Sequence, residues 1–208
     1  MSYGVEKNKI INIGAYVENL TIRQYFDLPQ LPHVEDEVFV DAGCFDGESV
    51  KNFVKWSNGQ YKEIYSFEPD GGCYQKCKEI LADVSNCYLI NKGLWNTDTV
   101  LSFKATGLSD STICEDGETR IHTCRMDEEL KGKRVTFIKM DIEGAEREAL
   151  IGAENIIKEQ KPKLAISIYH KKEDIWEIPN LILEINPNYK FYIRQYSLRD
   201  AETVLYAF

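Results

Sequence analysis

Short apolar segments alternate with amphipathic ones along most of this 208-residue chain. Apolar runs at residues 38–40, 63–67, 87–91, 135–140 and 164–168 predict five strands, because short apolar runs between polar residues are typical of buried parallel strands. Helical spacing follows most of these runs. The expected helices cover residues 48–57 and 71–84, the segment carrying Ala145, Ala149, Ala153 and Ile157, and the segment around 175–185. The alternation predicts parallel βαβ units.

The end of the chain and one inserted segment complete the predicted sheet. Residues 191–195 and 203–208 predict two final strands, and residues 99–104 and 119–124 predict a hairpin. The polar segment between the hairpin strands is either a functional loop or a solvated tip. We therefore expect an α/β fold with a Rossmann-like, seven-stranded, mostly parallel sheet, helices on both faces and an inserted hairpin.

Residues 1–37 precede the first predicted strand and have weak periodicity. Scattered apolar residues indicate a helix or two, closed by Pro29 and Pro32. Such an extension either covers a ligand crevice or packs on the sheet edge, and the sequence does not separate the two. We divide the chain into this helical extension, which can act as a cap, and one domain at residues 38–208.

A turn with two glycines joins the first predicted strand to the first predicted helix. Its pattern is Asp41-x-Gly43-x-x-x-Gly47, and Ser49 can cap the helix that follows. Glycines let a backbone approach a ligand closely, and a helix N-terminus after a strand marks the nucleotide side of a doubly wound sheet. The turn therefore predicts a nucleotide-type ligand.

Charge indicates which nucleotide suits this turn. Asp41, Asp46 and Glu48 lie in it, with no Lys or Arg beside them. Acids repel a pyrophosphate but suit S-adenosylmethionine, which carries a sulfonium and an ammonium and no phosphate. Glu68 follows Gly47 by 21 positions, close to the roughly 20 expected of a carboxylate that binds a ribose diol. The alternative, an NAD(P)-dependent oxidoreductase, requires a Gly-x-Gly-x-x-Gly turn, which this segment lacks.

Several ordered motifs add a family resemblance. They are Phe39-Val-Asp-Ala-Gly-Cys-Phe-Asp-Gly47, Phe67-Glu-Pro-Asp70, Gly93-Leu-Trp95, Ile138-Lys-Met-Asp-Ile-Glu-Gly-Ala-Glu146, Ile168-Tyr-His-Lys-Lys-Glu-Asp-Ile-Trp-Glu-Ile-Pro179 and Glu202-Thr-Val-Leu-Tyr-Ala207. From about Val38 to the C-terminus, the chain resembles the FkbM family of S-adenosylmethionine-dependent methyltransferases. The resemblance implies a class I methyltransferase fold and an enzyme of the EC 2.1.1 type that releases S-adenosylhomocysteine. It implies little about the methyl acceptor.

The cofactor is expected at the carboxyl ends of the first strands. Gly93, Leu94 and Trp95 are expected where the adenine edge meets the backbone, and Trp95 either stacks near the base or fills the sheet flank. Ser111, in the long polar segment, is expected to line the crevice. The expected cofactor contacts are Asp41, Ala42, Gly43, Phe45, Gly47, Ser49, Glu68, Pro69, Asp70, Gly93, Leu94, Trp95, Ser111 and Asp141.

Candidates for chemistry follow the fourth and fifth predicted strands. An oxygen nucleophile must lose its proton, and the carboxyl ends of these strands face the crevice. Asp141, Glu143 and Glu146 follow strand four and either act at the site or only cap a helix. His170 follows strand five and has a suitable unperturbed pKa for a general base. We expect His170, Asp141 and Glu143 to be catalytic. No ligand spacing demands a metal, and whether a divalent metal assists is left open.

Four further residues are expected on the acceptor side. Lys171 and Trp176 follow the expected catalytic histidine, and Arg194 and Tyr196 lie near the end of the sixth strand. Trp176 is equally well explained as a packing residue. Gln195 stands where many members of the FkbM family carry His, which weakens any role of this position in proton transfer.

The composition limits the classes of partner that the protein is expected to bind. A formal net charge of −9 argues against a nucleic-acid partner. Six cysteines without a Cys-x-x-Cys pair, and the lack of a signal peptide or long apolar span, favour a cytoplasmic protein with reduced thiols and no membrane partner. We expect O-methylation of a hydroxyl on a small molecule or on a sugar or polysaccharide unit. A cofactor-binding module without catalysis is a further alternative. The oligomeric state does not follow from the sequence.

Overall fold

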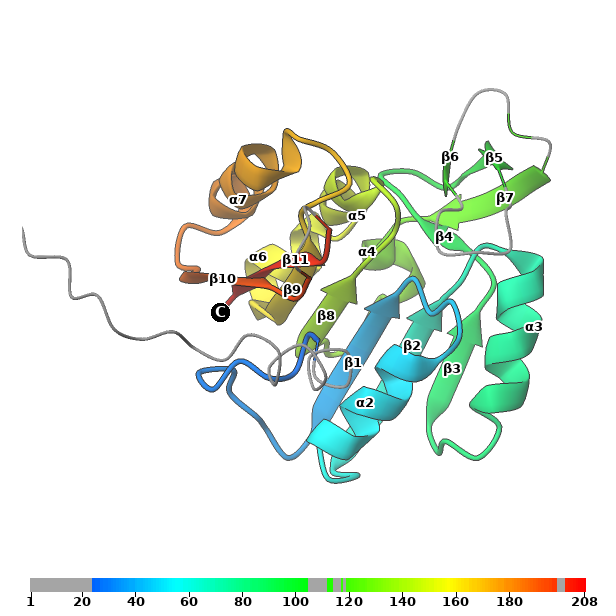
Figure 1. Cartoon of the computed structure of the whole chain (residues 1–208), viewed down its shortest axis with the longest axis horizontal. Coiled ribbons are helices and arrows are strands. Elements are labelled where there is room, and N and C mark those ends of the chain that lie inside the picture. Colours follow the sequence, from blue (N-terminus) through cyan, green and yellow to red (C-terminus); the bar gives the residue numbers. More distant parts are fainter. Residues whose placement is uncertain (1–23, 105–111, 114–116, 118, 198–200) are drawn as a thin grey trace, which may run out of the picture.

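The computed structural model describes residues 24–104, 112–113, 117, 119–197 and 201–208. Its centre is a seven-stranded sheet in the order β10-β11-β9-β8-β1-β2-β3 (Figure 1). The seven strands predicted for the main sheet are confirmed, with ends that differ by up to two residues. They are β1 (Glu37–Ala42), β2 (Tyr61–Phe67), β3 (Cys87–Ile90), β8 (Phe137–Met140), β9 (Lys163–Ser167), β10 (Phe191–Gln195) and β11 (Thr203–Ala207).

The sheet is mostly parallel. Among the described strands of this sheet, only β11 runs antiparallel to its neighbours, β9 and β10. The order of the strands along the chain reverses between β1 and β8, where Asp41 and Lys139 are register partners. Open α/β sheets bind ligands beyond the carboxyl ends of their strands at such a switch point. The edge formed by the ends of β1, β2, β8 and β9 is therefore where a site is expected.

Helices cover both faces of the sheet. Strand residues alternate between the faces, so that Phe39 and Phe137 point to one side and Val40 and Ile138 to the other. The helices α2 and α3 pack on the first side, and α4 to α7 pack on the second. None of the described helices has both the length and the apolar character of a membrane span. The bounds are α2 (Glu48–Trp56), α3 (Gly71–Ile80), α4 (Met126–Glu129), α5 (Glu146–Gly152), α6 (Glu154–Gln160) and α7 (Asp174–Ile185).

The predicted hairpin is part of a second, smaller sheet. Its strands β5 and β7 pair antiparallel, as expected, and two short strands that were not predicted join them. The order is β4-β7-β5-β6, with β4 parallel to β7. The bounds are β4 (Gly93–Leu94), β5 (Thr99–Lys104), β6 (Thr112–Ile113) and β7 (Thr119–Cys124).

The single helix predicted after strand four is two helices, α5 and α6. The carboxylate of Asp127 accepts the N–H groups of Asn155 and Ile156, at 3.1 and 3.0 Å, and so provides an acceptor for the start of α6. Gly152 ends α5 against the second sheet, because a Cβ added there would lie 2.0 Å from the carbonyl oxygen of Trp95. Contacts from distant segments thus divide a pattern that is continuous in the sequence.

The described part of the N-terminal extension contains no helix: residues 24–36 form turns and irregular chain. Four of its side chains nevertheless lie in the core on the α2 side of the sheet. The remainder of the extension, residues 1–23, lies outside the described residues. The four buried side chains are Tyr25, Phe26, Leu28 and Leu31.

Candidate active site

Strand β1 ends in a buried ion pair. Asp41 is completely buried, and its Oδ1 lies 3.1 Å from Nζ of Lys139. Its Oδ2 accepts the hydroxyls of Ser49 at 2.6 Å and Ser66 at 3.2 Å. The prediction that Ser49 caps α2 is wrong, because its hydroxyl donates to the buried carboxylate instead. The N-cap residue is Gly47, which provides no side-chain hydrogen bond. The charge of Asp41 is balanced within the protein, and its contacts fix the start of the turn.

The two glycines of the turn are required by protein packing. Gly43 has φ +84°, and a Cβ added there would lie 2.1 Å from the carbonyl oxygen of Asp141. Gly47 has φ +76°, and an added Cβ would lie 3.1 Å from the side chain of Leu81. The N–H of Gly43 donates to the carbonyl of Phe67 at 3.0 Å. Gly43 thus allows the ends of β1 and β8 to approach closely, and Gly47 allows the turn to pack against the end of α3. Both are reasons other than the predicted approach to a ligand.

Glu68 directly follows β2 and is held by backbone donors. One carboxylate oxygen accepts the N–H of Phe45 at 2.8 Å, and the other accepts the N–H of Asp70 at 2.9 Å. Burial raises the pKa of Glu68, while these two donors oppose the rise. Each oxygen keeps lone pairs for a further donor. Asp70 itself caps α3 by accepting the N–H groups of Gly72 and Cys73.

The segment Gly93–Leu94 is β4, and the next residue continues its pairing. The N–H of Trp95 donates to the carbonyl of Cys124 at 3.0 Å. A Cβ added at Gly93 would lie 3.6 Å from Pro69, so this strand borders the residues after β2. Ala42 and Leu94 are buried, and Ser111 lies outside the described residues.

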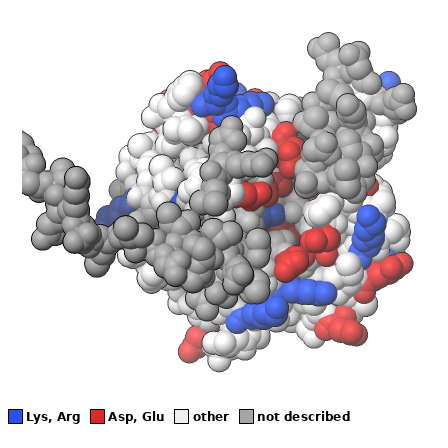
Figure 2. Space-filling model, viewed as in Figure 1, with Lys and Arg blue, Asp and Glu red and all other residues white. Residues whose placement is uncertain are grey.

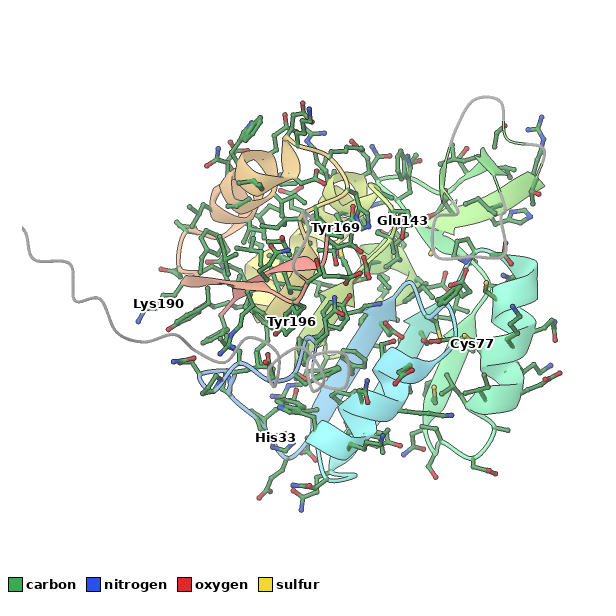
Figure 3. The ribbon with its side chains drawn as sticks, viewed as in Figure 1. His33, Cys77, Glu143, Tyr169, Lys190 and Tyr196 are labelled. Carbon is green, nitrogen blue, oxygen red and sulfur yellow. The ribbon has the colours of Figure 1, made fainter. Side chains whose placement is uncertain are left out.

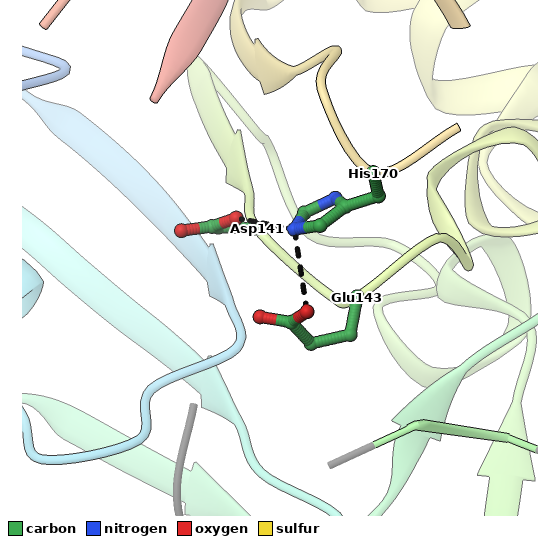
Figure 4. Close-up of side chains that lie close together, drawn as sticks. All are labelled: Asp141, Glu143 and His170. Atoms are coloured by element: carbon green, nitrogen blue, oxygen red, sulfur yellow. Dashed lines mark ion pairs between the residues drawn. The ribbon is translucent and has the colours of Figure 1, made fainter. Parts of the chain in front are cut away.

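The three predicted catalytic residues meet at the ends of β8 and β9 (Figure 4). Asp141 directly follows β8, and His170 lies shortly after β9. Nε2 of His170 lies 3.4 Å from Oδ1 of Asp141 and 3.5 Å from Oε2 of Glu143. The side chain of His170 is 7% exposed, whereas those of Asp141 and Glu143 are 22% and 28% exposed. The cluster therefore opens to the surface through its carboxylates.

A strained turn brings the two carboxylates of this cluster to one side. Glu143 has φ +54° and is followed by Gly144 with φ +88°. A left-handed conformation costs a residue other than glycine about 1–2 kcal/mol, and such strain is concentrated at functional sites. The carboxylate of Glu146 accepts the N–H of Ile142 at 2.9 Å and closes the turn. The backbone thus reverses directly after Asp141, which places Asp141 and Glu143 against the imidazole.

Three neighbours complete the cluster. The hydroxyl of Tyr25 donates to Oδ2 of Asp141 at 2.7 Å, and that of Tyr169 donates to Oδ1 at 3.1 Å. Figure 3 shows Tyr169 at this edge of the sheet. Glu146 is completely buried, and its Oε1 lies 2.9 Å from Nδ1 of His170. The N-terminal extension thus contributes a residue, Tyr25, to the site.

Sequence reasoning did not select Tyr25, Tyr169 or Lys139. Tyr169 carried a local signal, because it lies beside His170 at the end of an apolar strand. Lys139 carried another, because a lysine inside a buried strand needs an anion beside it. Tyr25 carried none: it is 116 positions from Asp141, and only the fold brings the two together.

The carboxylates set the protonation of the cluster. Burial alone would lower the pKa of His170, but Glu143, Glu146 and Asp141 raise it to about 10. The imidazole is therefore protonated at neutral pH, which corrects the expectation of an unperturbed general base. Burial likewise opposes ionisation of Asp141, yet Lys139 and the imidazolium hold its pKa below the usual value.

The residues predicted on the acceptor side do not lie together in the structure. Nζ of Lys171 donates to a backbone carbonyl of the turn after β8, so this residue borders the cluster. Trp176 lies exposed on α7. Arg194 lies 3.6 Å from Asp27, and the hydroxyl of Tyr196 donates to the same carboxylate. Arg194 and Tyr196 thus belong to a group around Asp27, on the α2 side of the sheet.

Comparisons with solved structures define the class. The chain is similar to an rRNA methylase from Streptococcus thermophilus, with a TM-score of 0.53, 15% identity, and coverage of 98% of this chain and 97% of that one. It is also similar to fibrillarin from Aeropyrum pernix, solved with natively bound S-adenosyl-L-methionine, with a TM-score of 0.59, 12% identity, and coverage of 91% and 74%. The fold is therefore the α/β class I methyltransferase fold.

Sequence identifies the family. Residues 41–196 match the family described as the methyltransferase FkbM domain, so the chain belongs to this family of S-adenosylmethionine-dependent methyltransferases. The methyltransferase FkbM structure from Methylobacillus flagellatus KT is similar over 90% of the chain, with a TM-score of 0.78 and 29% identity. The chain spans about half, 47%, of that protein's length. No curated protein matches the chain. Because the chain belongs to a methyltransferase family, the alternative of an NAD(P)-dependent oxidoreductase is not retained.

Proposed function

We propose that this protein transfers a methyl group from S-adenosylmethionine to a hydroxyl of a small molecule or of a sugar or polysaccharide unit. The observation that carries the proposal is the cluster of Asp141, Glu143 and His170 at the switch point of a methyltransferase sheet. Methyl transfer to an uncharged oxygen requires that a proton leave the acceptor. Carboxylates that are partly exposed at the carboxyl edge are suited to that task.

The residues around β1 and β2 fit the cofactor. Glu68 has a fixed carboxylate with lone pairs left over, as recognition of a ribose diol requires. We assign the ribose to Glu68 and the cationic end of the cofactor to the acidic edge near Asp141. Figure 2 shows separate groups of Asp and Glu side chains near the middle of this face, with Lys and Arg side chains among them. When bound, the cofactor supplies a methyl group on a sulfonium, which is ready for in-line displacement.

The protein's own contribution is position and proton removal. The tyrosines at Asp141 fix its carboxylate, so the acceptor hydroxyl is held at a defined place beside the cluster. Because the imidazole of His170 is already protonated, we assign proton acceptance to a carboxylate. Glu143 is the more exposed of the two carboxylates that face His170. His170 then orients these carboxylates.

The charge of the edge favours an uncharged acceptor. Acidic side chains lie along it, and the whole chain carries a formal net charge of −9. Phosphates are repelled by such a surface, whereas the hydroxyls of a sugar or polyol are not. The acceptor class we propose is therefore a neutral hydroxylated molecule.

A product-mass screen tests this proposal. Methyl-deuterated S-adenosylmethionine is incubated with the protein and a panel of sugars and hydroxylated metabolites, and products are read by mass spectrometry. We expect a labelled methyl ether on at least one acceptor, lost in Glu143→Gln and kept in Glu128→Gln, an exposed control on α4. Cofactor binding without transfer to any hydroxyl, amine or nucleic-acid acceptor in the panel would favour a non-catalytic module. Transfer to nitrogen alone would overturn the hydroxyl assignment.

A further inference from the structure

We propose that Asp141, Glu143 and His170 bind one divalent transition-metal cation of the Mn²⁺ or Zn²⁺ class. This inference rests on the proposed function for its role and on the geometry of the cluster for its existence. Among the residues that the structure describes, these three form the one group of His, Cys, Asp and Glu side chains placed to hold a metal ion. Their ligand atoms all lie within 4.8 Å of one another. Mixed carboxylate and imidazole donors suit Mn²⁺, Fe²⁺ and Zn²⁺ better than they suit Mg²⁺.

The distances fit shared coordination. Nε2 of His170 lies 3.4 Å and 3.5 Å from its two carboxylate oxygens. Two ligands about 2.0–2.2 Å from a tetrahedral ion lie about 3.3–3.6 Å apart. Figure 4 shows the ring nitrogen directed at the space between Asp141 and Glu143. The imidazole–carboxylate spacing is therefore already that of ligands sharing one ion, and the ligand atoms of the two carboxylates lie within 4.8 Å of each other.

A second observation points to a missing partner. The side chain of His170 is about nine-tenths buried, and neither of its ring nitrogens has a partner in hydrogen-bond geometry, although Oε1 of Glu146 lies 2.9 Å from Nδ1. A buried imidazole without such a partner is costly, and unsatisfied buried groups are rare. The surrounding carboxylates, those of Asp141, Glu143 and Glu146, outnumber the imidazole in either protonation state. Of the two lysines described above near the cluster, Lys139 is paired with Asp41, and Lys171 donates to the carbonyl of Gly144. A divalent cation would displace the proton from Nε2, take that nitrogen as a ligand and offset the excess of negative charge.

The supporting shell has the form that metal sites use. Metal-binding histidines commonly direct their second nitrogen at a carboxylate, and ligating carboxylates accept further hydrogen bonds. Here Glu146 lies 2.9 Å from Nδ1 of His170, and Tyr25 and Tyr169 both donate to Asp141. Glu146 is thus a positioning residue. Two of the proposed ligands, Asp141 and His170, thus have supporting neighbours of this kind.

The cation would supply what the carboxylates lack. A carboxylate is a weak base toward an alcohol, whereas a bound divalent ion lowers the pKa of a hydroxyl that coordinates it. The ion would also orient that hydroxyl beside the methyl donor. This role deepens the proposed O-methylation and is separate from recognition of the cofactor by Glu68.

Electron paramagnetic resonance with Mn²⁺ tests the site directly. The chain is freed of metal with a chelator and titrated with Mn²⁺, and the loss of the free-ion signal gives the affinity and stoichiometry. We expect one Mn²⁺ per chain, displaced by Zn²⁺ and poorly by Mg²⁺. Asp141→Asn and Glu143→Gln should each weaken binding by about 100-fold or more, and Glu146→Gln by about 10–100-fold. Glu128→Gln, the exposed control, should bind as the unchanged chain does.

Pulsed measurements identify the histidine without relying on a variant of the cluster alone. The chain has three histidines, so a nitrogen coupling to bound Mn²⁺ must come from His33, His122 or His170. We expect the coupling to persist in His33→Gln and His122→Gln and to vanish in His170→Gln. Absence of the coupling in the unchanged chain, or its loss in either control, would overturn the assignment even if a cluster variant failed to fold.

Calorimetry with S-adenosylhomocysteine separates this inference from the proposed function. Binding of the nucleoside without any Mn²⁺ binding would overturn the metal site and leave methyl transfer standing. Binding of Mn²⁺ without the nucleoside would support the metal site and count against the proposed function. Competition between the two ligands would overturn the role that we give the ion, because the ion and the bound methyl donor could not then act together.

Discussion

The two ends of β1 carry the same chemical parts and use them differently. At its amino end, Glu37 is completely buried and forms an ion pair with Lys163. At its carboxyl end, Asp41 is completely buried and forms an ion pair with Lys139. Each carboxylate also accepts a hydroxyl, from Thr136 at one end and from Ser49 at the other. Burial and pairing of charge therefore do not by themselves mark a functional site.

The two ion pairs differ in how many carboxylates interact with the lysine. Burial lowers the pKa of Lys163, and Glu37 only partly opposes it. Burial also acts on Lys139, but Asp41 and Asp141 together outweigh it and raise its pKa. The lysine at the carboxyl end thus acts on two carboxylates, one of them in the proposed catalytic cluster. A buried pair indicates function when it supports partly exposed groups at the switch point of the sheet.

Removing the lysines should give the largest effects. Lys163→Met and Lys139→Met each leave a buried carboxylate unpaired, and we expect each to lower the free energy of unfolding by about 3–5 kcal/mol. Only Lys139→Met should also weaken binding of S-adenosylmethionine, because Nζ of Lys139 donates to two carbonyls of the turn. Chemical denaturation and calorimetry measure the two quantities.

Matched double variants sharpen this comparison. Glu37→Gln with Lys163→Met, and Asp41→Asn with Lys139→Met, leave no unpaired charge and should recover part of the stability. Equal losses of cofactor affinity at the two ends of β1 would contradict the division into a structural and a functional end.

The next largest difference is expected in the stability cost of replacing two glycines with positive φ, one at each end of the sheet. Gly59 has φ +71° and open space around an added Cβ, so Gly59→Ala should cost about 1–2 kcal/mol. Gly43→Ala adds a clash with the carbonyl of Asp141 and should cost about 3 kcal/mol or more. It should also lower methyl transfer, because it displaces Asp141. Thermal unfolding and activity are the measurements, and comparable costs at the two glycines would argue against tight contact between β1 and β8.

Removal of a hydroxyl from each carboxylate should give smaller effects. Ser49→Ala and Thr136→Val each take a donor from a buried charged acceptor, at about 1.5–3 kcal/mol. We expect Thr136→Val to cost more, because Thr136 also accepts the N–H of Val38. Cofactor affinity should fall only in Ser49→Ala. An unchanged cofactor affinity in Ser49→Ala would mean that the hydroxyl of Ser49 is not needed for the conformation of the turn that binds the cofactor.

The smallest effects concern pH and have opposite signs at the two ends of β2. Burial raises the pKa of Glu68, so the stability this group contributes is present below its unfolded pKa and is lost as pH rises through the folded value. A hydrogen bond from Tyr65 lowers the pKa of Glu63, so its contribution is present above the unfolded pKa and is lost as pH falls. Stability relative to Glu68→Gln should therefore fall as the pH rises above the ordinary pKa of a Glu side chain, and stability relative to Glu63→Gln should rise as the pH approaches that ordinary pKa from below. Slopes of the same sign would contradict these environments.

The sequence predicted the parts of the molecule that follow from local pattern. The apolar runs gave the strands of the main sheet, and strand ends followed by Asp141 and His170 gave the centre of the candidate site. What it did not predict depends on contacts between distant segments. Tyr25 reaches Asp141 across 116 positions, and Asp127 divides one helical pattern into α5 and α6. Such contacts leave no periodic pattern in the sequence.

One prediction was wrong because it judged a residue by its type alone. The expected proton acceptor, His170, was judged by its unperturbed pKa, whereas three carboxylates from two other segments determine its protonation. Residue type and position predicted where the chemistry lies, and only the surrounding charges determine which group performs each step.

Calorimetric titration with S-adenosylmethionine tests the central claim most directly. We predict one site per chain that also binds S-adenosylhomocysteine, with affinity lowered about 10–100-fold in Glu68→Gln, the equivalent of about 1.5–3 kcal/mol for a hydrogen bond to a charged group, and unchanged in Glu63→Gln. A folded protein that binds neither nucleoside, or whose affinity is indifferent to Glu68, would contradict the account.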